Sequence, residues 1–230
     1  MLLATAIFIN FVTSNKAYAQ TGDPLVAPYN ALMIEQDITD YNAWYDAVLL
    51  NKDAWQAAGL GGPAFARNME DPYRVLTYYS VWDTAKARAF INSPALKQIM
   101  HNAGVKGDIK TLFLHVEYDL NTIMEQDRLF ITQHITNYET WRSAFDHEDR
   151  KNRLKSGLVD RTIAHSLDDP QLVVLFFGIT NRDKARAYIK SPDYNKFCVA
   201  AGIDQDPTIT WYEWNNYKGW YRQSLPAGNK

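Results

Sequence analysis

The stretch SPALKQIMHNAG, residues 93–104, recurs in altered form as SPDYNKFCVAAG, residues 191–202. In each stretch the serine caps a helix, and the proline takes the first helical position, where its missing N–H costs nothing. The glycine at the end of each stretch stops the helix. The two stretches therefore predict the same helix at two places in the chain.

Outward from these helices, one pattern covers residues 33–118 and again residues 130–215. The recurring positions of the first copy are Tyr41, Trp44, Gly59, Asp71-Pro72, Ala87-Arg88-Ala89 and Ile91, and their counterparts are Tyr138, Trp141, Gly157, Asp169-Pro170, Ala185-Arg186-Ala187 and Ile189. The offset is 97 at Tyr41 (138 − 41) and 98 at Gly59 (157 − 59), so one extra residue enters between Trp141 and Gly157. A repeat of this length indicates a duplicated domain rather than a solenoid.

Each copy predicts the order strand, helix, strand, strand, helix, strand. These elements span residues 32–38, 41–58, 63–70, 73–82, 84–104 and 109–118 in the first copy, and 129–135, 138–156, 159–167, 172–179, 182–201 and 208–214 in the second. The order βαββαβ is that of the ferredoxin-like unit, an antiparallel sheet with both helices on one face. The strands also carry apolar and aromatic residues on the other face of the sheet, so that face must be buried against another part of the protein. We therefore predict an α+β fold, in which two tandem ferredoxin-like units pack their antiparallel sheets into one intramolecular α/β barrel.

Both copies resemble the dimeric α/β-barrel superfamily, which includes the antibiotic-biosynthesis monooxygenase-like domains. The resemblance is carried by residues 93–105 and by Tyr138-Glu139-Thr140-Trp141, and it extends over almost all of residues 31–215. The superfamily includes cofactor-free monooxygenases, haem-handling proteins, isomerases, cyclases and proteins with no known reaction. It has no common catalytic motif, so the resemblance is informative about the fold and much less so about the reaction.

The N-terminus has the pattern of an export signal. Leu2 to Val12 is an apolar run too short to span a bilayer, and the small-residue site Ala17-Tyr18-Ala19 follows it, so we expect cleavage before Gln20. No Lys or Arg precedes the apolar run, which leaves an uncleaved anchor or a start misassigned upstream as alternatives. The expected organisation is a signal peptide (1–19), a linker (20–30), two repeats (31–119 and 129–215) and an aromatic tail (216–230). We expect a periplasmic or secreted protein without a stable membrane span after cleavage.

Composition argues against several kinds of partner. The formal net charge of −2 gives no electrostatic reason to expect nucleic acid. Cys198 is the only cysteine, which excludes an intrachain disulfide and a cysteine-based metal cluster. Neither a glycine-rich phosphate loop nor a Gly-x-Ser-x-Gly elbow is present. The charged run at residues 146–151 alternates in sign and predicts a solvated helix face.

Candidate acid–base residues lie on the first and last strands of each copy. Alternation along these strands places Asp37 and His115 on the barrel-facing side of the first copy, and His134 and Glu213 on that of the second. Because the first and last strands are neighbours in a ferredoxin-like sheet, we expect the pairs Asp37–His115 and His134–Glu213. A histidine paired with a carboxylate can move a proton, although such a pair can also be a satisfied polar patch. The pairs would bind a metal only if they converged, and we predict no metal and no cofactor.

Candidate ligand-binding residues come from equivalent strands of the two copies. Arg67 and His165 occupy matching positions on the second strands, where they reach an anionic ligand or lie on an edge-strand surface. Tyr78 and Phe176 on the third strands, with Trp211 on the last strand, are expected to form an aromatic wall.

Two functions remain open from the sequence. One is an exported protein that binds an apolar or aromatic small molecule and acts as a cofactor-independent monooxygenase or a proton-transfer enzyme. The other is a non-catalytic binding or protein-interaction module, in which the aromatic tail contacts a partner or a second protomer of a homo-oligomer.

Overall fold

The computed structural model describes residues 27–120 and 125–215. The predicted signal peptide (1–19) and aromatic tail (216–230) lie outside the described residues, as does most of the linker (20–30). Within the described ranges, no helix combines the length and apolar character needed to cross a membrane.

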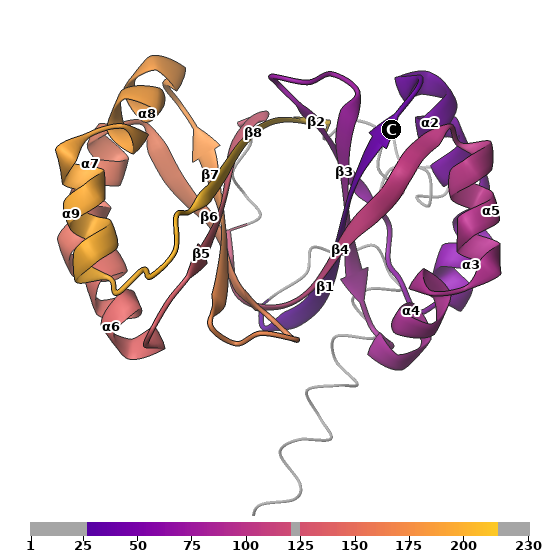
Figure 1. The fold of residues 1–230 in the computed structure, drawn as a ribbon, viewed down its shortest axis with the longest axis horizontal. Coiled ribbons are helices and arrows are strands. Elements are labelled where there is room, and N and C mark those ends of the chain that lie inside the picture. Colours follow the sequence, from indigo (N-terminus) through magenta and orange to yellow (C-terminus); the bar gives the residue numbers. More distant parts are fainter. Residues whose placement is uncertain (1–26, 121–124, 216–230) are drawn as a thin grey trace, which may run out of the picture. The chain divides into compact units, whose positions relative to one another are not determined.

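The structure confirms the α+β fold and the βαββαβ order in both copies. The first copy consists of β1 (Tyr29–Ile38), α2 (Tyr41–Leu50), α3 (Lys52–Ala57), β2 (Ala64–Asn68), β3 (Arg74–Val81), α4 (Thr84–Ile91), α5 (Pro94–Asn102) and β4 (Val105–Asp119). The second consists of β5 (Asp127–His134), α6 (Tyr138–Ser143), the π-helical turn η1 (Ala144–Asp149), α7 (Arg150–Lys155), β6 (Leu158–Ser166), β7 (Leu172–Ile179), α8 (Arg182–Ile189), α9 (Pro192–Ala200) and β8 (Thr208–Asn215). The strands follow the order β1-β3-β2-β8-β5-β7-β6-β4 in a closed antiparallel barrel (Figure 1).

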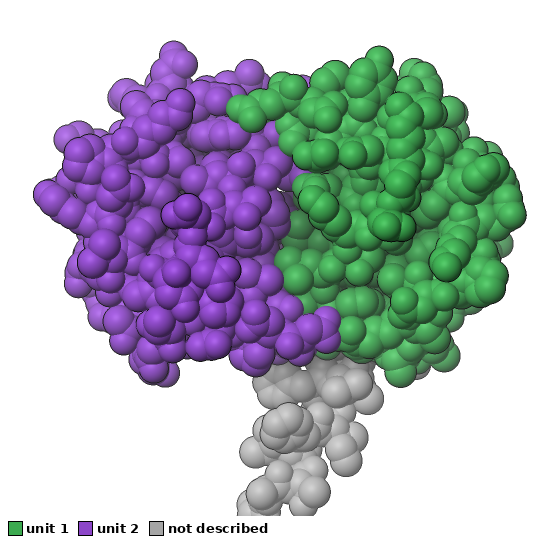
Figure 2. Space-filling view, viewed as in Figure 1, with its two compact units in different colours: residues 1–113, 215–230 green, residues 114–214 purple. Residues whose placement is uncertain are grey.

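The described chain divides into two compact units (Figure 2). Unit 1 holds the residues up to Phe113 together with Asn215, and unit 2 holds Leu114–Trp214. The last residues of β4 therefore belong to the second unit, where they pair with β6.

The helix starts follow from the capping residues that the repeat retains. Ser93 and Ser191 accept hydrogen bonds from the backbone N–H groups of Leu96 and Tyr194, at 3.2 Å in both copies. Asp40 caps α2 in the same way, with its carboxylate 2.7 Å from the N–H of Ala43. Each cap satisfies an N–H group that a helix start leaves without a partner.

The two units fill matching core positions with different chemistry. In unit 1, Trp55 is fully buried, stacks on Tyr79 with ring centroids 4.9 Å apart, and meets the edge of Phe90 at 5.2 Å. In unit 2, the position of Trp55 is taken by Arg153, whose guanidinium lies 3.5 Å from the centroid of the Phe145 ring. Unit 1 is therefore apolar where unit 2 buries a charge.

Arg153 of unit 2 is held by a buried polar network. Its guanidinium donates to Asp149 at 2.9 Å and to the backbone oxygen of Phe145 at 2.8 Å, and donates twice to Asp160, at 3.0 and 3.1 Å. Tyr188 donates its hydroxyl hydrogen to the other oxygen of Asp149. These contacts compensate for the removal of two charges from water.

The extra residue of the second copy coincides with η1, between Trp141 and Gly157. A single π-helical turn accommodates an inserted residue without ending the helix. Asp149 closes this turn and is only 2% exposed. The prediction of a solvated face for residues 146–151 is therefore wrong for Asp149, because the wider turn directs this carboxylate toward Arg153.

Replacing Gly157 with alanine should destabilise unit 2. Gly157 has φ of +74°, and a Cβ there would lie 2.9 Å from the backbone nitrogen of Asn181. Left-handed strain of about 1–2 kcal/mol and overpacking of about 1–3 kcal/mol together predict a loss of about 2–5 kcal/mol in the free energy of unfolding, measured by urea denaturation. Gly107, with φ of +65° and no atom within 4 Å of a Cβ, is the control. Gly107→Ala should show the strain alone, and equal losses in both variants would contradict the steric argument.

Candidate functional site

A carboxylate bridges a histidine and a tyrosine in unit 2. Glu117, near the end of β4, accepts a hydrogen bond from the Tyr138 hydroxyl through Oε2. Its Oε1 lies 2.8 Å from Nδ1 of His165 on β6. An ionised carboxylate can only accept, so Nδ1 of His165 carries a hydrogen, and in the neutral ring Nε2 is then the atom with the lone pair. The side chains of His165 and Glu117 are 27% and 28% exposed, so a small molecule can reach them.

A second histidine lies beside this bridge. His115 on β4 stands opposite His165 in the strand register, and the two ring centroids are 5.2 Å apart. Burial lowers the pKa of His115, and the neighbouring His165 lowers it further, while Glu117 acts in the opposite direction. His115 therefore favours its neutral form.

Local backbone features place the three elements of the site. The register of β4 against β6 shifts between Val116 and Tyr118, so Glu117 is the extra residue of a β-bulge. Bulges re-aim side chains and are frequent beside active sites. Tyr138 opens α6 directly after the N-cap Asn137, whose side chain accepts from Thr140 N at 2.9 Å. Burial, and next the hydrogen bond to Glu117, raise the pKa of Tyr138, which keeps its hydroxyl a donor.

The lowered pKa of His115 predicts a pH-dependent stability. Between the folded-state pKa of His115 and about pH 6.5, an unfolded histidine binds more protons than the folded one, so the contribution of His115 to stability rises with pH up to about 6.5 and then levels off. His115→Gln should reduce this slope in unfolding experiments repeated across that range. His147→Gln replaces an exposed histidine and should leave the slope unchanged. A slope that is the same in His115→Gln and the unchanged protein would contradict the prediction.

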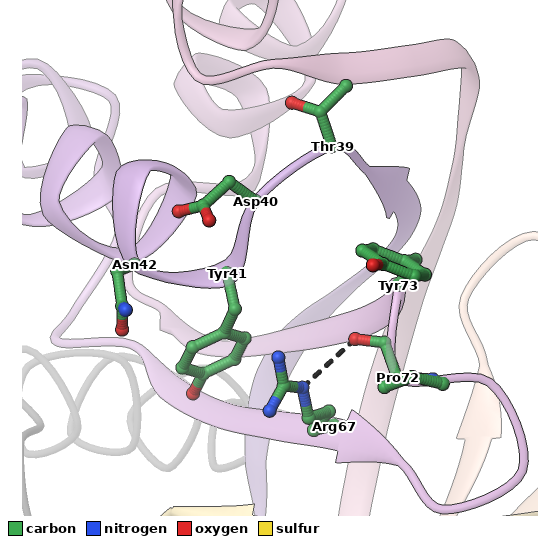
Figure 3. Close-up of a pocket in the computed structure, with 7 residues that line it drawn as sticks. All are labelled: Thr39, Asp40, Tyr41, Asn42, Arg67, Pro72 and Tyr73. Atoms are coloured by element: carbon green, nitrogen blue, oxygen red, sulfur yellow. Dashed lines mark hydrogen bonds between the residues drawn. The ribbon is translucent and has the colours of Figure 1, made fainter.

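The matching place in unit 1 is an open pocket of about 270 Å³. Figure 3 shows Arg67 between the rings of Tyr41 and Tyr73 in this pocket. The Arg67 guanidinium lies over the Tyr41 ring, 4.3 Å from its centroid, and Nε donates to the backbone oxygen of Pro72 at 2.9 Å. The lining residues are Thr39, Asp40, Tyr41, Asn42, Arg67, Pro72 and Tyr73.

Solved structures provide the comparison for this arrangement. An anthrone oxidase-like protein matches with a TM-score of 0.57 at 10% identity, over 88% of this chain and 98% of that one. A candidate chlorite dismutase matches with a TM-score of 0.56 at 10% identity, over 83% and 96%. A candidate monooxygenase from Fusobacterium nucleatum matches with a TM-score of 0.51 at 9% identity, over 83% and 94%. No family model and no curated protein match the sequence.

The chain has the dimeric α/β-barrel fold. At about one residue in ten identical, these likenesses concern the backbone, so the chemistry has to be argued from this chain's own side chains.

In this dimeric α/β-barrel chain the predicted pair His134–Glu213 does not form. Strands β5 and β8 are antiparallel, so Glu213 stands opposite Asp127, at the far end of β5 from His134. Nδ1 of His134 instead lies 2.7 Å from Asp204, and its Nε2 is 3.7 Å from Asp169. The prediction used the adjacency of the two strands but not their antiparallel direction, which determines which residues lie opposite each other.

The pair Asp37–His115 is replaced by other partners. Asp37 accepts from Arg74, directly opposite on β3, at 2.9 Å, and this hydrogen bond lowers the pKa of the Asp37 carboxyl. His115 contacts His165 instead. Arg67 and His165 are equivalent in the repeat, but Arg67 contacts Tyr41 directly, whereas His165 is joined to Tyr138 through Glu117.

The predicted aromatic wall divides between the two faces of the sheets. Phe177 packs toward η1, with its ring 6.3 Å from that of Phe145, so the adjacent Phe176 faces away from the helices and lies 5.0 Å from Phe130. In unit 1, Tyr79 stacks on Trp55 of α3, so the adjacent Tyr78 faces away as well.

Trp211 lies on the opposite face from the one predicted. The guanidinium of Arg186 on α8 is 4.6 Å from the Trp211 ring, and that of Arg88 on α4 is 4.3 Å from the equivalent Phe113. The last strands therefore turn these rings toward the helices. Sequence alternation assigned these rings to the wrong face because both faces of the last strands carry apolar residues.

The roles of Glu117 and Tyr138 were missed. The sequence does contain one signal for them, since a tyrosine opens the first helix of both copies at residues 41 and 138. Among residues 27–120 and 125–215, no group of three or more His, Cys, Asp or Glu side chains is arranged to hold a metal ion.

Proposed function

We propose that the chain binds an apolar or aromatic small molecule and transfers a proton at the group His165, Glu117 and Tyr138. The observation that carries the proposal is the Glu117 carboxylate, which contacts both His165 Nδ1 and the Tyr138 hydroxyl. In this arrangement Nε2 of His165 accepts the substrate proton, and Glu117 stabilises the imidazolium that results. Tyr138 fixes the second oxygen of the carboxylate and so its orientation.

The substrate class follows from how acidic a C–H group must be for a histidine to remove its proton. A histidine removes protons from C–H groups only where the carbanion is delocalised, as in a conjugated ketone. The anthrone oxidase-like neighbour has a name that refers to a compound of this kind. The half-buried ring of Tyr138 offers an apolar surface beside the carboxylate, and the fully buried Trp141 packs behind it, with ring centroids 5.5 Å apart.

Oxygenation needs no further cofactor in this proposal. Loss of a proton from the CH2 group of anthrone gives a delocalised anion whose electrons reduce dioxygen. The CH2 group becomes a carbonyl, and the second oxygen atom leaves as water. The protein supplies the base and the binding surface, which matches a cofactor-independent monooxygenase.

The proton-transfer step can be measured alone. Anthrone in deuterated buffer without dioxygen should exchange its CH2 hydrogens faster when the protein is present, as observed by proton NMR. Acceleration that is unchanged in Glu117→Gln would contradict the assignment. A protein with no effect on exchange would instead favour the non-catalytic module.

Export is part of the proposal and has its own test. Expression of the full chain in a bacterium should give periplasmic material that begins at Gln20, as determined by intact mass. Retention of Met1 in the membrane fraction would support the uncleaved anchor. Replacing Ala17 and Ala19 with bulky residues should block cleavage, because the site requires small side chains.

A further inference from the structure

The open pocket of unit 1 can be compared with the equivalent place in unit 2, because the same loop precedes the first helix of both copies. Thr39 donates its hydroxyl to the backbone oxygen of Gly104 at 3.2 Å, and Thr136 donates to that of Gly202 at the same distance. These matched bonds fix the loop before each first helix. They hold Tyr41 and Tyr138 in corresponding places.

The two places differ in what they contain. In unit 2, the carboxylate of Glu117 fills the space between the Tyr138 hydroxyl and His165. In unit 1, the corresponding Tyr41 and Arg67 line a pocket of about 270 Å³. No carboxylate of residues 27–120 or 125–215 pairs with Arg67. A carboxylate therefore joins the tyrosine to the strand residue in unit 2, whereas none among the described residues pairs with the equivalent Arg67 in unit 1.

The geometry of Arg67 suits a carboxylate. Its Nε donates to the backbone oxygen of Pro72 at 2.9 Å, and its guanidinium carbon lies over the Tyr41 ring, 4.3 Å from the centroid. Its two terminal nitrogens have no hydrogen-bond acceptor within the described part of the chain. A guanidinium anchored in this way keeps its donor fork oriented, and a carboxylate matches this fork with two parallel hydrogen bonds.

The other lining residues provide an aromatic surface and one carboxylate, that of Asp40. The Arg67 guanidinium covers one face of the Tyr41 ring, so the accessible aromatic surface of the pocket comes from Tyr73, which is 56% exposed (Figure 3). Asp40 also lines the pocket, but its Oδ1 accepts from the N–H of Ala43 as the cap of α2. The negative charge of Asp40 is thus offset by the helix start.

We propose that this pocket is a second binding site, specific for a small aromatic carboxylate that pairs with Arg67 and packs its ring against Tyr73. It is separate from the proton-transfer group of unit 2. The two sites can therefore fail independently.

The test uses benzoate as the probe and benzamide as its uncharged match, titrated into the full chain by isothermal calorimetry. Benzoate should bind, and benzamide should bind at least tenfold more weakly. Equal binding of the two, or no binding of benzoate, would overturn the proposal, since the site rests on charge pairing.

Substitutions locate the binding. Arg67→Gln should weaken benzoate at least tenfold while anthrone exchange stays unchanged, and Arg67→Lys should lie between the two because it keeps the charge without the fork. Arg150→Gln removes an exposed arginine elsewhere and should leave benzoate binding intact. Unweakened binding in Arg67→Gln would overturn the proposal. Circular dichroism of each variant separates lost binding from lost folding. If Arg67→Gln does not fold, weaker benzoate binding by Arg67→Lys supports the proposal, and unweakened binding overturns it.

Discussion

Glu117→Gln should lower the protein-catalysed exchange of anthrone hydrogens by about 10²–10⁴-fold, the range that a positioned general base contributes. The amide nitrogen of glutamine can donate to Nδ1 of His165, which would move the histidine hydrogen to Nε2. Nε2 would then have no lone pair for the substrate proton. The initial rate of deuterium incorporation at saturating anthrone measures the effect.

Two further variants make this result specific. Glu139→Gln removes the same charge from an exposed position on α6 and should leave the exchange rate unchanged. Tyr138→Phe removes one hydrogen bond to Glu117 but keeps the base, so its loss should be smaller than that of Glu117→Gln. A larger loss in Tyr138→Phe would assign the proton transfer to the tyrosine instead.

Arg153→Ala should lower the free energy of unfolding by about 3–5 kcal/mol, because the buried charge of Asp149 is left without its partner. The side chains of Arg153 and Asp149 are 3% and 1% exposed, so water cannot replace the lost hydrogen bonds. Guanidinium denaturation followed by circular dichroism measures the change. The effect should exceed that of any surface pair in unit 2.

The matched control for this prediction is Arg182→Ala. Arg182 also pairs with an aspartate, Asp127, but its side chain is 57% exposed. Exposed pairs contribute about 0–1 kcal/mol, so the loss should remain within that range. Similar losses in Arg153→Ala and Arg182→Ala would show that burial does not set the cost.

The fold could be predicted from the sequence because its signals are local. Ser93, Pro94 and Gly104 mark the limits of a helix within a dozen residues of each other, and the repeat marks the same limits a second time. The order of elements then leaves few arrangements of the sheet. Each of these inferences depends on neighbours in the chain.

The site depended on features that are not local. His165 meets Glu117 because β4 pairs with β6, and Glu117 is re-aimed by a bulge that no residue pattern announces. The pairing direction of β5 and β8 separates His134 from Glu213 by the length of a strand. Alternation could not assign the faces of the last strands, since both faces are apolar. Equivalence between the copies was the more reliable guide, and it did relate Arg67 to His165.

The π-helical turn of unit 2 has a consequence for how the chain can change. One inserted residue places Asp149 beside Arg153, whereas the shorter copy fills the matching space with Trp55 and Phe90. A residue exchanged alone between the copies would leave either a lone charge or an oversized ring in a closed core. Recombination between the two halves of the gene would therefore be harmful at this point. The halves have therefore lost their interchangeability at this point.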